Sequence, residues 1–534
     1  METKREPERG AAPSPSPASI VGRLREHLRL DGLGFLPGLT LPEDGPLARV
    51  GFSNGTLDTN WVRHFGGRRT APNAAEVATS IHAALTRYAS RPSARAADAL
   101  EAVMQVPSAR QVADAIHERI EGDPVVNRAV AHAAVRDIAD RTASSEVLKL
   151  AIVLLGVVGD SSDNALFRLV GMHGDFTAIS ARAIELANRD PVPHLLDLAP
   201  ATGGWGRVAI IETLLAHRTP AVREYLLTEA LVGLSHELAS EVAWSIATEC
   251  DMLGMVTGSP TERQIRAVGA TLATLAGSPF KDLGDYADAA RACAVLLPKF
   301  EPFAASLHDY RLVAALHDRA AVDPGHRASL PWSDQERATV IDLSRRILDR
   351  DAWRAAVLEA LEDPTRRYEV VRIADRLGIP YRDRLVGWIR QDPLRSYGWY
   401  LLCQEVDAST IDDILALAAD VLDVGSIATG PADEVGLGPG FERDDCVGSI
   451  LQVLRGRRGK PGFPGRGEDL LLAALRSRGI RNRRVSLRIL EGWPKEWITP
   501  RLYEAIDLAT GDPTEAVRQD AARLLQGLKR PPLQ

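Results

Sequence analysis

The sequence predicts an all-α protein, and three observations support that class: its composition, its recurring helical segments and the turn residues between them. Ala and Leu dominate, while aromatic residues make up only 5% of the 534 residues. Small and straight-chain residues favour helices that pack closely, whereas sheets favour β-branched and aromatic residues. Hydrophobic residues at 45% and charged residues at 25% are normal for a globular protein.

Internal repetition refines this class to an α-solenoid, a stack of helical hairpins. Three helical segments read alike, and each is followed by a second, shorter helical run. The longer segments are residues 147–155, 179–187 and 206–215, and the shorter runs are residues 164–170, 192–198 and 222–227. The repeat length is about 25–32 residues, the size expected of stacked helical hairpins.

Asp-Pro pairs recur between the helical segments. They are Asp123-Pro124, Asp190-Pro191, Asp363-Pro364, Asp392-Pro393 and Asp512-Pro513. We expect the Asp carboxylate to cap the following helix and Pro to fit its first turn. After the last pair come Val517-Arg518 and Ala521. This pattern resembles HEAT-type repeats, over roughly residues 76–260 and 350–530.

A narrower resemblance involves residues 202–207 (Thr-Gly-Gly-Trp-Gly-Arg) and 481–488 (Arg-Asn-Arg-Arg-Val-Ser-Leu-Arg). Both are similar to segments of a largely uncharacterised bacterial HEAT-like family, some members of which are labelled limonene hydroxylase. That label implies an enzyme that uses haem, flavin or iron. The sequence has no recognisable binding motif for any of these groups, and no P-loop, GxGxxG or HExxH motif. We therefore expect no cofactor.

The chain divides, by composition, into five parts. We expect a disordered tail at 1–20, an irregular N-terminal cap at 21–75, HEAT-like repeats at 76–424, a loop-rich insertion at 425–468 and C-terminal helical repeats at 469–534. The insertion holds two Gly/Pro-rich stretches on either side of a helix near residues 446–454.

The cysteines and the apolar segments indicate where in the cell the protein is located. The four cysteines form no CxxC pair, so we expect reduced thiols in a cytoplasmic protein, with Cys293 in the core. The N-terminus lacks the apolar stretch of a secretory signal. The richest apolar window, residues 148–158, includes Lys149 and Gly156 and suits a buried helix better than a membrane span. We expect no membrane partner.

Three short motifs have catalytic or metal-binding forms, and each has a plainer interpretation. Residues 51–55 match GxSxG around Ser53, but no strand–turn–helix context surrounds them. His173-Gly174-Asp175 matches the start of an iron site, but falls in a turn where Asp175 would cap a helix. His308 and His317, each followed by Asp, lie 2.5 turns apart in one helix, so they point to opposite sides. We expect no catalytic residue and no metal site.

Charge is the most unusual local feature. Residues 455–488, here the basic segment, hold eleven Lys and Arg against two acids, which gives +9 in a chain of −7 and leaves −16 elsewhere. Candidate partner-binding residues are Arg455, Arg457, Arg458, Lys460, Arg476, Arg478, Arg481, Arg483 and Arg484. Arg suits phosphate and carboxylate, so the segment indicates nucleic acid, an acidic protein surface or an acidic region of the same solenoid. The alternative is a solvated loop and helix face.

Aromatic residues gather at Trp388, Tyr397, Trp399 and Tyr400, and again at Trp493 and Trp497. Large rings can line a partner groove, but more often they fill gaps between repeats, and we favour that role. The leading functional hypothesis is a non-enzymatic scaffold that binds a macromolecular partner, since solenoids provide long concave surfaces. Two alternatives stay open: nucleic-acid or other anion binding through the basic segment, and an enzyme of the hydroxylase type.

Overall fold

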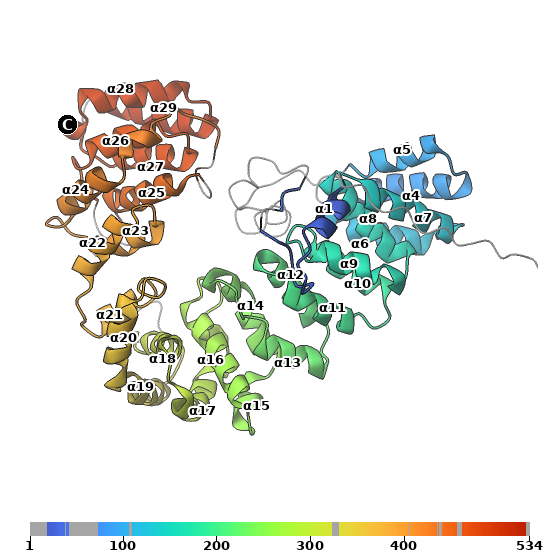
Figure 1. Ribbon diagram of the computed structural model, residues 1–534, viewed down its shortest axis with the longest axis horizontal. Helices are drawn as coiled ribbons and strands as arrows, with labels where there is room; N and C mark the ends of the chain where they lie inside the picture. The colour runs from blue at the N-terminus through green and yellow to red at the C-terminus, as the bar shows by residue number, and fades with distance from the viewer. Residues whose placement is uncertain are drawn as a thin grey trace, which may run out of the picture. The chain divides into compact units, whose positions relative to one another are not determined.

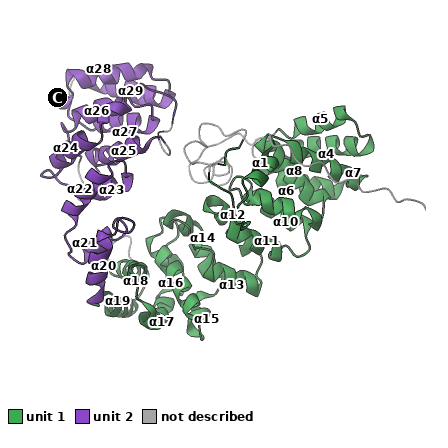
Figure 2. Ribbon diagram, in the orientation of Figure 1, with its two compact units in different colours: residues 1–44, 53–350 green, residues 45–52, 351–534 purple. Residues whose placement is uncertain are grey.

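The computed structural model of the protein describes residues 19–37, 39–41, 73–105, 109–322, 330–404, 406–434, 436, 440–456 and 462–529. These residues form helices and turns, and no strand occurs among them beyond two isolated β-bridges (Figure 1). The expected all-α class is confirmed. Contacts divide the chain into two compact units, unit 1 (residues 1–44 and 53–350) and unit 2 (residues 45–52 and 351–534) (Figure 2).

Unit 1 holds the first seventeen of the described α-helices. They are α1 (Ile20–Glu26), α4 (Ala74–Ser90), α5 (Ala94–Val103), α6 (Ala109–Gly122), α7 (Arg128–Arg141), α8 (Ser145–Val158), α9 (Asn164–Gly171), α10 (Thr177–Ala187), α11 (Val192–Leu198), α12 (Gly204–Leu215), α13 (Pro220–Thr228), α14 (His236–Glu249), α15 (Met252–Thr257), α16 (Glu262–Gly277), α17 (Ala289–Phe300), α18 (Leu307–Ala320) and α19 (Asp334–Leu348). Four 3-10 helices lie between them: η3 (Ser161–Asp163), η4 (Ala199–Ala201), η5 (Leu283–Asp285) and η6 (Glu301–Phe303).

Alternate helices of unit 1 pack against one another. Helix α4 contacts α6, α6 contacts α8, and the series continues through α10, α12, α14, α16 and α18. Helix α8 is the most buried, because it is apolar on nearly every side and is packed by α6, α7 and α10. Lys149 within it is buried and its Nζ lies 2.9 Å from Glu146 Oε1. The prediction of a buried helix at 148–158 is confirmed, and no described helix is long and apolar enough to cross a membrane.

The repeated segments read from the sequence are all helical. Residues 147–155, 179–187 and 206–215 lie within α8, α10 and α12, which pack in sequence against one another. The shorter runs lie within α9, α11 and α13. The recurrence of these apolar segments was therefore a reliable signal for these helices.

The first described residues pack on α7 and α9 of unit 1. Ser19 caps α1 by accepting a hydrogen bond from Gly22 N at 3.0 Å, and Ile20 N donates to Thr142 O at 3.0 Å. After α1 the chain turns back through a β-bridge between Leu28 and Phe35. The expected irregular cap at 21–75 thus begins with a short helix and a tight turn, and its residues 42–72 lie outside the described part.

Unit 2 holds the remaining ten described α-helices. They are α20 (Ala352–Glu362), α21 (Val371–Arg376), α22 (Arg382–Gln391), α23 (Ser396–Leu402), α24 (Ile411–Val421), α25 (Glu442–Arg455), α26 (Glu468–Leu475), α27 (Ile480–Glu491), α28 (Pro500–Leu508) and α29 (Glu515–Lys529), with η7 (Val424–Ile427), η8 (Lys495–Trp497) and η9 (Ala509–Gly511) between them. Alternate helices pack here as well: α23, α25, α27 and α29 form one series, and α26 contacts α28.

The Asp-Pro pairs differ from the prediction in detail. Asp512 accepts a hydrogen bond from Thr514 N at 2.8 Å, and Asp363 accepts one from Thr365 N at 2.8 Å. Each carboxylate therefore closes a tight turn onto the amide two residues on. Helix α11 begins after Asp190-Pro191 with Pro191 at its N-cap and no side-chain cap. In α10 the N-cap residue is Phe176, and Asp175 lies one residue before it.

Two boundaries of the structure bear on the expected domains. The division between the compact units falls after residue 350, inside the range 76–424 that the sequence assigned to one array. Within the loop-rich range 425–468, the helix expected near 446–454 is present and longer, as α25. A parallel β-bridge joins Glu434 to Gly479, where Gly436 and Gly479 pass so closely that a Cβ on either would meet the other backbone within 3 Å.

Candidate functional site

The basic segment lies in unit 2, and most of its described charge is paired within the unit. Five of its arginines form ion pairs with acids that are distant in sequence. The pairs are Arg466–Asp412, Arg478–Glu434, Arg481–Asp445, Arg483–Asp512 and Arg484–Asp520. The excess of +9 is therefore a property of the linear segment, and the folded unit neutralises much of it.

Arg483 is fully buried, which corrects its assignment as a partner-binding residue. Its guanidinium donates to the carbonyls of Ser477 at 2.7 Å, Arg478 at 2.7 Å and Ala432 at 2.8 Å. Its Nε lies 2.8 Å from Asp512 Oδ2. A guanidinium enclosed in this way cannot reach an external anion, and it instead joins three chain segments.

Arg481 and Arg484 are half-buried and pair across helices. Arg481 Nη1 on α27 donates to Asp445 Oδ1 on α25 at 2.7 Å. Arg484 Nε donates to Asp520 Oδ2 on α29 at 2.9 Å, and Arg523 Nη2 donates to the other oxygen of Asp520. Burial opposes ionisation of Asp520, but the hydrogen bonds and charges of Arg484 and Arg523 outweigh it, so the pKa of Asp520 lies below its ordinary value.

The other candidates of the basic segment have separate positions. Arg455, at the end of α25, and Arg476, just after α26, are exposed. Arg478 packs over the Phe441 ring at 4.2 Å and donates to Gly440 O at 2.7 Å. Arg457, Arg458 and Lys460 lie outside the described residues. The described arginines therefore form no single binding surface.

A different group of arginines lies among the aromatic rings of unit 2. We call it the arginine–aromatic cluster, and it comprises Arg367, Tyr368, Arg372, Trp388, Arg395, Tyr397 and Tyr400. Arg367 lies over the rings of both Tyr368 (5.3 Å) and Trp388 (5.0 Å). Arg395 lies over Tyr368 at 5.5 Å. Guanidinium groups at these distances are attracted to the ring faces, so the contacts hold the rings in fixed positions.

Part of the cluster is core and part is surface. Trp399, beside it, is fully buried and donates its indole N–H to Pro393 O at 2.8 Å. Trp388 and Tyr368 are buried, and burial raises the pKa of the Tyr368 phenol. Tyr397, in contrast, is 42% exposed and stacks on Tyr400 with ring centroids 5.8 Å apart. The packing role that we favoured holds for the tryptophans at 388 and 399, whereas Tyr397 faces solvent.

Several side chains near Tyr397 are also exposed. Leu394 is 40% exposed, Arg395 is exposed, and Arg372 is exposed and donates to the Tyr400 hydroxyl at 3.4 Å. We call Leu394, Arg395, Tyr397 and Tyr400 together the Tyr397 surface. It combines an aliphatic side chain, two phenol rings and a guanidinium on one short segment.

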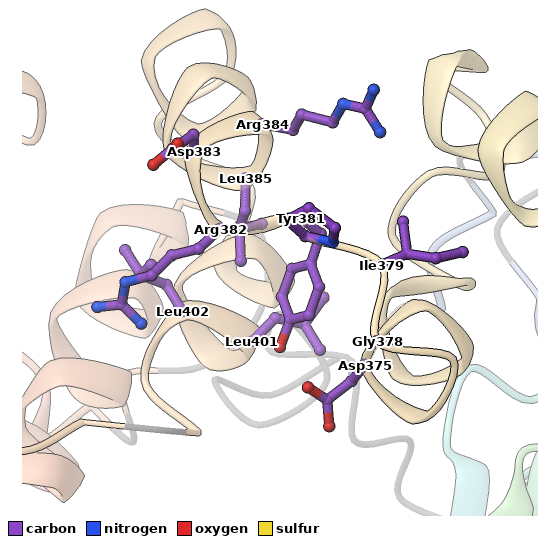
Figure 3. Close-up of a pocket in the computed structure, with 11 residues that line it drawn as sticks. Asp375, Gly378, Ile379, Tyr381, Arg382, Asp383, Arg384, Leu385, Leu401 and Leu402 are labelled. Carbon is purple, nitrogen blue, oxygen red and sulfur yellow. The ribbon is translucent and has the colours of Figure 1, made fainter.

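A hollow of about 750 Å³ lies on the same helices, and we call it the Tyr381 pocket. Its apolar wall includes Leu385, Leu401 and Leu402, and its polar groups include Asp375 and Tyr381. Figure 3 shows the Tyr381 ring pointing toward the side where Leu401 and Asp375 lie, while Arg382 and Arg384 extend in opposite directions. Helices α21 and α23 supply residues to both the pocket and the arginine–aromatic cluster. The combination of an apolar wall with a few polar groups suits the side chains of a bound partner.

The short motifs have these outcomes. Ser53 lies outside the described residues. His173 Nδ1 lies 3.9 Å from Asp175 Oδ2, and the His173 ring packs between Phe35 and Phe176. Asp309 belongs to a capping box with Ser306 at the start of α18. Among the described residues, no group of three or more His, Cys, Asp or Glu side chains has the arrangement of a metal site.

Sequence reasoning noticed Trp388, Tyr397 and Tyr400 but not the arginines that interleave with them. The signal was present as Arg367-Tyr368 and Arg395-Ser396-Tyr397. Net charge did not expose it, because acids are mixed into the same stretch and the local excess is small. No protein-family model matches the chain, and no curated protein is significantly similar to it.

Proposed function

We propose that this protein is an α-solenoid of HEAT-like hairpins that acts as a non-enzymatic scaffold and binds a protein partner through the Tyr397 surface. The observation that carries the proposal is the exposure of Leu394 and Tyr397 on either side of Arg395. Tyr and Arg are enriched at the energetic centres of protein interfaces, where large rings exclude water around a guanidinium.

The spacing of contacts between helices supports the repeat architecture. Side chains of one helix repeatedly bond to residues about one repeat further along the chain. Examples in unit 1 are Arg168 with Asp197, 29 residues apart, His132 with Asp163, 31 apart, and Glu185 with His217, 32 apart. In unit 2, Arg483 and Asp512 are 29 apart. These separations agree with the period of about 25–32 residues in the sequence.

The rigidity of the Tyr397 surface supports a binding role. Tyr368 holds two side chains of this surface in place. It contacts Tyr397 edge-on at 6.5 Å between centroids, and Arg395 lies over its ring. A surface fixed before binding loses less conformational entropy when a partner docks. The Tyr381 pocket on the same helices offers a place for a partner side chain. The four buried thiols fit the cytoplasmic location that we propose.

A pair of tyrosine variants tests the proposal. Tyr397→Ala removes the exposed ring of the Tyr397 surface, and Tyr503→Ala removes a comparably exposed ring, 38% against 42%, on α28. Both variants and the parent chain are used as bait in the source cells, and captured proteins are quantified by mass spectrometry. We expect one protein to be lost with Tyr397→Ala and retained with Tyr503→Ala. Titration of that purified protein should show an affinity loss of about tenfold or more.

Capture that is equal for the three baits would contradict the proposal, and so would capture lost equally with both variants. The nucleic-acid alternative is weakened because Arg481, Arg483 and Arg484 already pair with acids. The hydroxylase alternative rests on the family resemblance. It would be revived by about one haem, flavin or iron per purified chain in an absorbance spectrum and elemental analysis.

A further inference from the structure

A second hollow, in unit 1, is lined by cations and by no acid. It has a volume of about 350 Å³ and lies among α1, α7 and α9. Arg25, Arg136 and Arg168 line it, together with Ser162, and none of its lining residues is Asp or Glu. We call it the Arg25 pocket. Each guanidinium has five N–H donors and uses three or fewer of them in hydrogen bonds to described residues, so donors remain for an anion.

We propose that the Arg25 pocket binds a small carboxylate that carries an apolar body. The rest of its lining is apolar: Leu28 from the N-terminal segment, and Leu166, Leu169 and Met172 from α9 and its end. Three of these side chains are buried by the fold, so the wall is already formed. We expect the arginines to bind the carboxylate of the ligand, because a guanidinium can donate two parallel hydrogen bonds to a carboxylate.

Two of the arginines are held in place by acids that do not line the pocket. Arg136 donates from Nε to Asp140 at 3.0 Å and from Nη1 to Asp163 at 2.9 Å. Arg168 donates from Nε to Asp197 at 2.6 Å and from Nη2 to Gly32 O at 3.1 Å. These bonds orient both groups before a ligand arrives, which lowers the entropic cost of binding.

Arg25 has the greatest capacity for a new bond. Its closest described acid is Asp140, and Nη2 lies 3.8 Å from Asp140 Oδ1, which is longer than a hydrogen bond. A guanidinium has five N–H donors, and Arg25 is exposed enough to turn toward an incoming carboxylate. Because α1 carries Arg25 and its following turn carries Leu28, the N-terminal segment supplies both a headgroup contact and part of the apolar wall.

The size of the pocket limits the ligand. A volume of about 350 Å³ is at the small end of ligand cavities, which run from about 300 to 1,000 Å³. The fitting class is therefore a carboxylate with a short hydrocarbon or single-ring body. Octanoate is a suitable probe, since it has one carboxylate and a flexible apolar chain.

Calorimetric titration of the full chain tests the proposal with four eight-carbon probes. Octanoate should bind, and the neutral octanol and the cationic octyltrimethylammonium should bind at least about tenfold more weakly, since a charged hydrogen bond contributes that much. Octyl phosphate tests whether the pocket prefers a carboxylate to a phosphate, and we expect it to bind no more tightly than octanoate.

Three arginine variants test the site, and one of them, Arg29→Gln, is the matched control. Arg25→Gln should weaken octanoate about tenfold, and Arg25→Lys should weaken it less because the charge stays. Arg29→Gln should leave binding unchanged, since Arg29 is an exposed neighbour that pairs with Asp31 at 2.6 Å and does not line the pocket. Circular dichroism of each variant checks that the fold is kept. Equal binding of octanoate and octyltrimethylammonium would overturn the proposal. So would equal weakening by Arg25→Gln and Arg29→Gln, or no heat of binding up to about 1 mM octanoate.

Discussion

Arg483 and Asp512 form an ion pair in the interior of unit 2, with Arg483 Nε 2.8 Å from Asp512 Oδ2 and side chains 0% and 1% exposed. The pair joins α27 to the turn that precedes α29. Arg483 also donates to carbonyls at 432, 477 and 478, so it ties the loop before α25 to the same place. The residue that the sequence offered for a partner thus acts inside the fold.

Removal of one member of this pair should be strongly destabilising. Arg483→Ala leaves Asp512 buried without its cation, and we expect the free energy of unfolding to fall by about 3–5 kcal/mol. Arg488→Ala, an exposed arginine on the same helix, should change it by about 0.5 kcal/mol or less. Urea unfolding followed by circular dichroism measures both. A loss with Arg483→Ala no larger than that with Arg488→Ala would show that the pair is not important for stability.

Two glycine-to-alanine substitutions should change the free energy of unfolding in opposite directions. A Cβ at Gly156 would lie 2.7 Å from Ala183 Cα, because α8 and α10 approach closely there. Gly156→Ala should therefore destabilise by about 1–3 kcal/mol through overpacking. Gly387, inside α22, has open space around its Cβ position, so Gly387→Ala should stabilise by about 0.5–1 kcal/mol. Thermal unfolding of the two variants checks the signs, and stabilisation by both would contradict close packing of α8 and α10.

The buried cysteines should react slowly in the native protein. Burial raises the pKa of Cys250 to about 11 and the pKa of Cys293 to about 12. Burial is also the main cause that raises the pKa of Cys446 to about 12. At pH 8 these thiols are protonated in the folded chain, and we expect a chromogenic disulfide reagent to modify them at least about 100-fold more slowly than in urea.

The same pKa shifts predict that the protein loses stability at alkaline pH. Thiols in the unfolded chain ionise near pH 8.5, whereas the folded ones hold their protons, so the unfolded state binds fewer protons above that pH. The contribution of these thiols to the free energy of unfolding should be fully present below about pH 8.5. It should decline as the pH rises toward 11 or 12. The variant Cys293→Ala should show a shallower decline, although it is less stable at neutral pH. An identical pH dependence in the parent and the variant would exclude this contribution.

Polyanion binding should be weak. Arg476 and Arg488 are exposed, whereas Arg481 and Arg484 are engaged with Asp445 and Asp520. We expect no gel shift of DNA or RNA at about 200 mM salt, where electrostatic complexes dissociate. At about 50 mM salt, Arg476→Gln with Arg488→Gln should reduce any shift more than Arg481→Gln with Arg484→Gln, although each pair removes two charges. A shift at the higher salt that only the second pair abolishes would restore the basic segment as a binding surface.

The sequence by itself determined that the repeated segments are helical. Recurring apolar segments placed α8, α10 and α12 and the shorter helices that follow them, and the apolar run around Cys293 is buried as expected. These are local properties, because a helix satisfies its own backbone hydrogen bonds and its apolar face repeats every 3.6 residues. The structure was needed even here for the ends of helices, since the N-cap positions of α10 and α11 are held by Phe176 and Pro191, each one residue after the Asp expected there.

Only the tertiary structure decided which charges are available. A window of 34 residues counts Arg481, Arg483 and Arg484 as excess charge, but their acids lie between 29 and 36 residues away. Packing of neighbouring helices brings those acids within hydrogen-bond distance, and each pair reduces the net charge that would attract a polyanion from solution. The same packing buried Trp388 and Trp399 while it left Tyr397 exposed, since the path of α23 over its neighbours sets which face of the helix meets solvent.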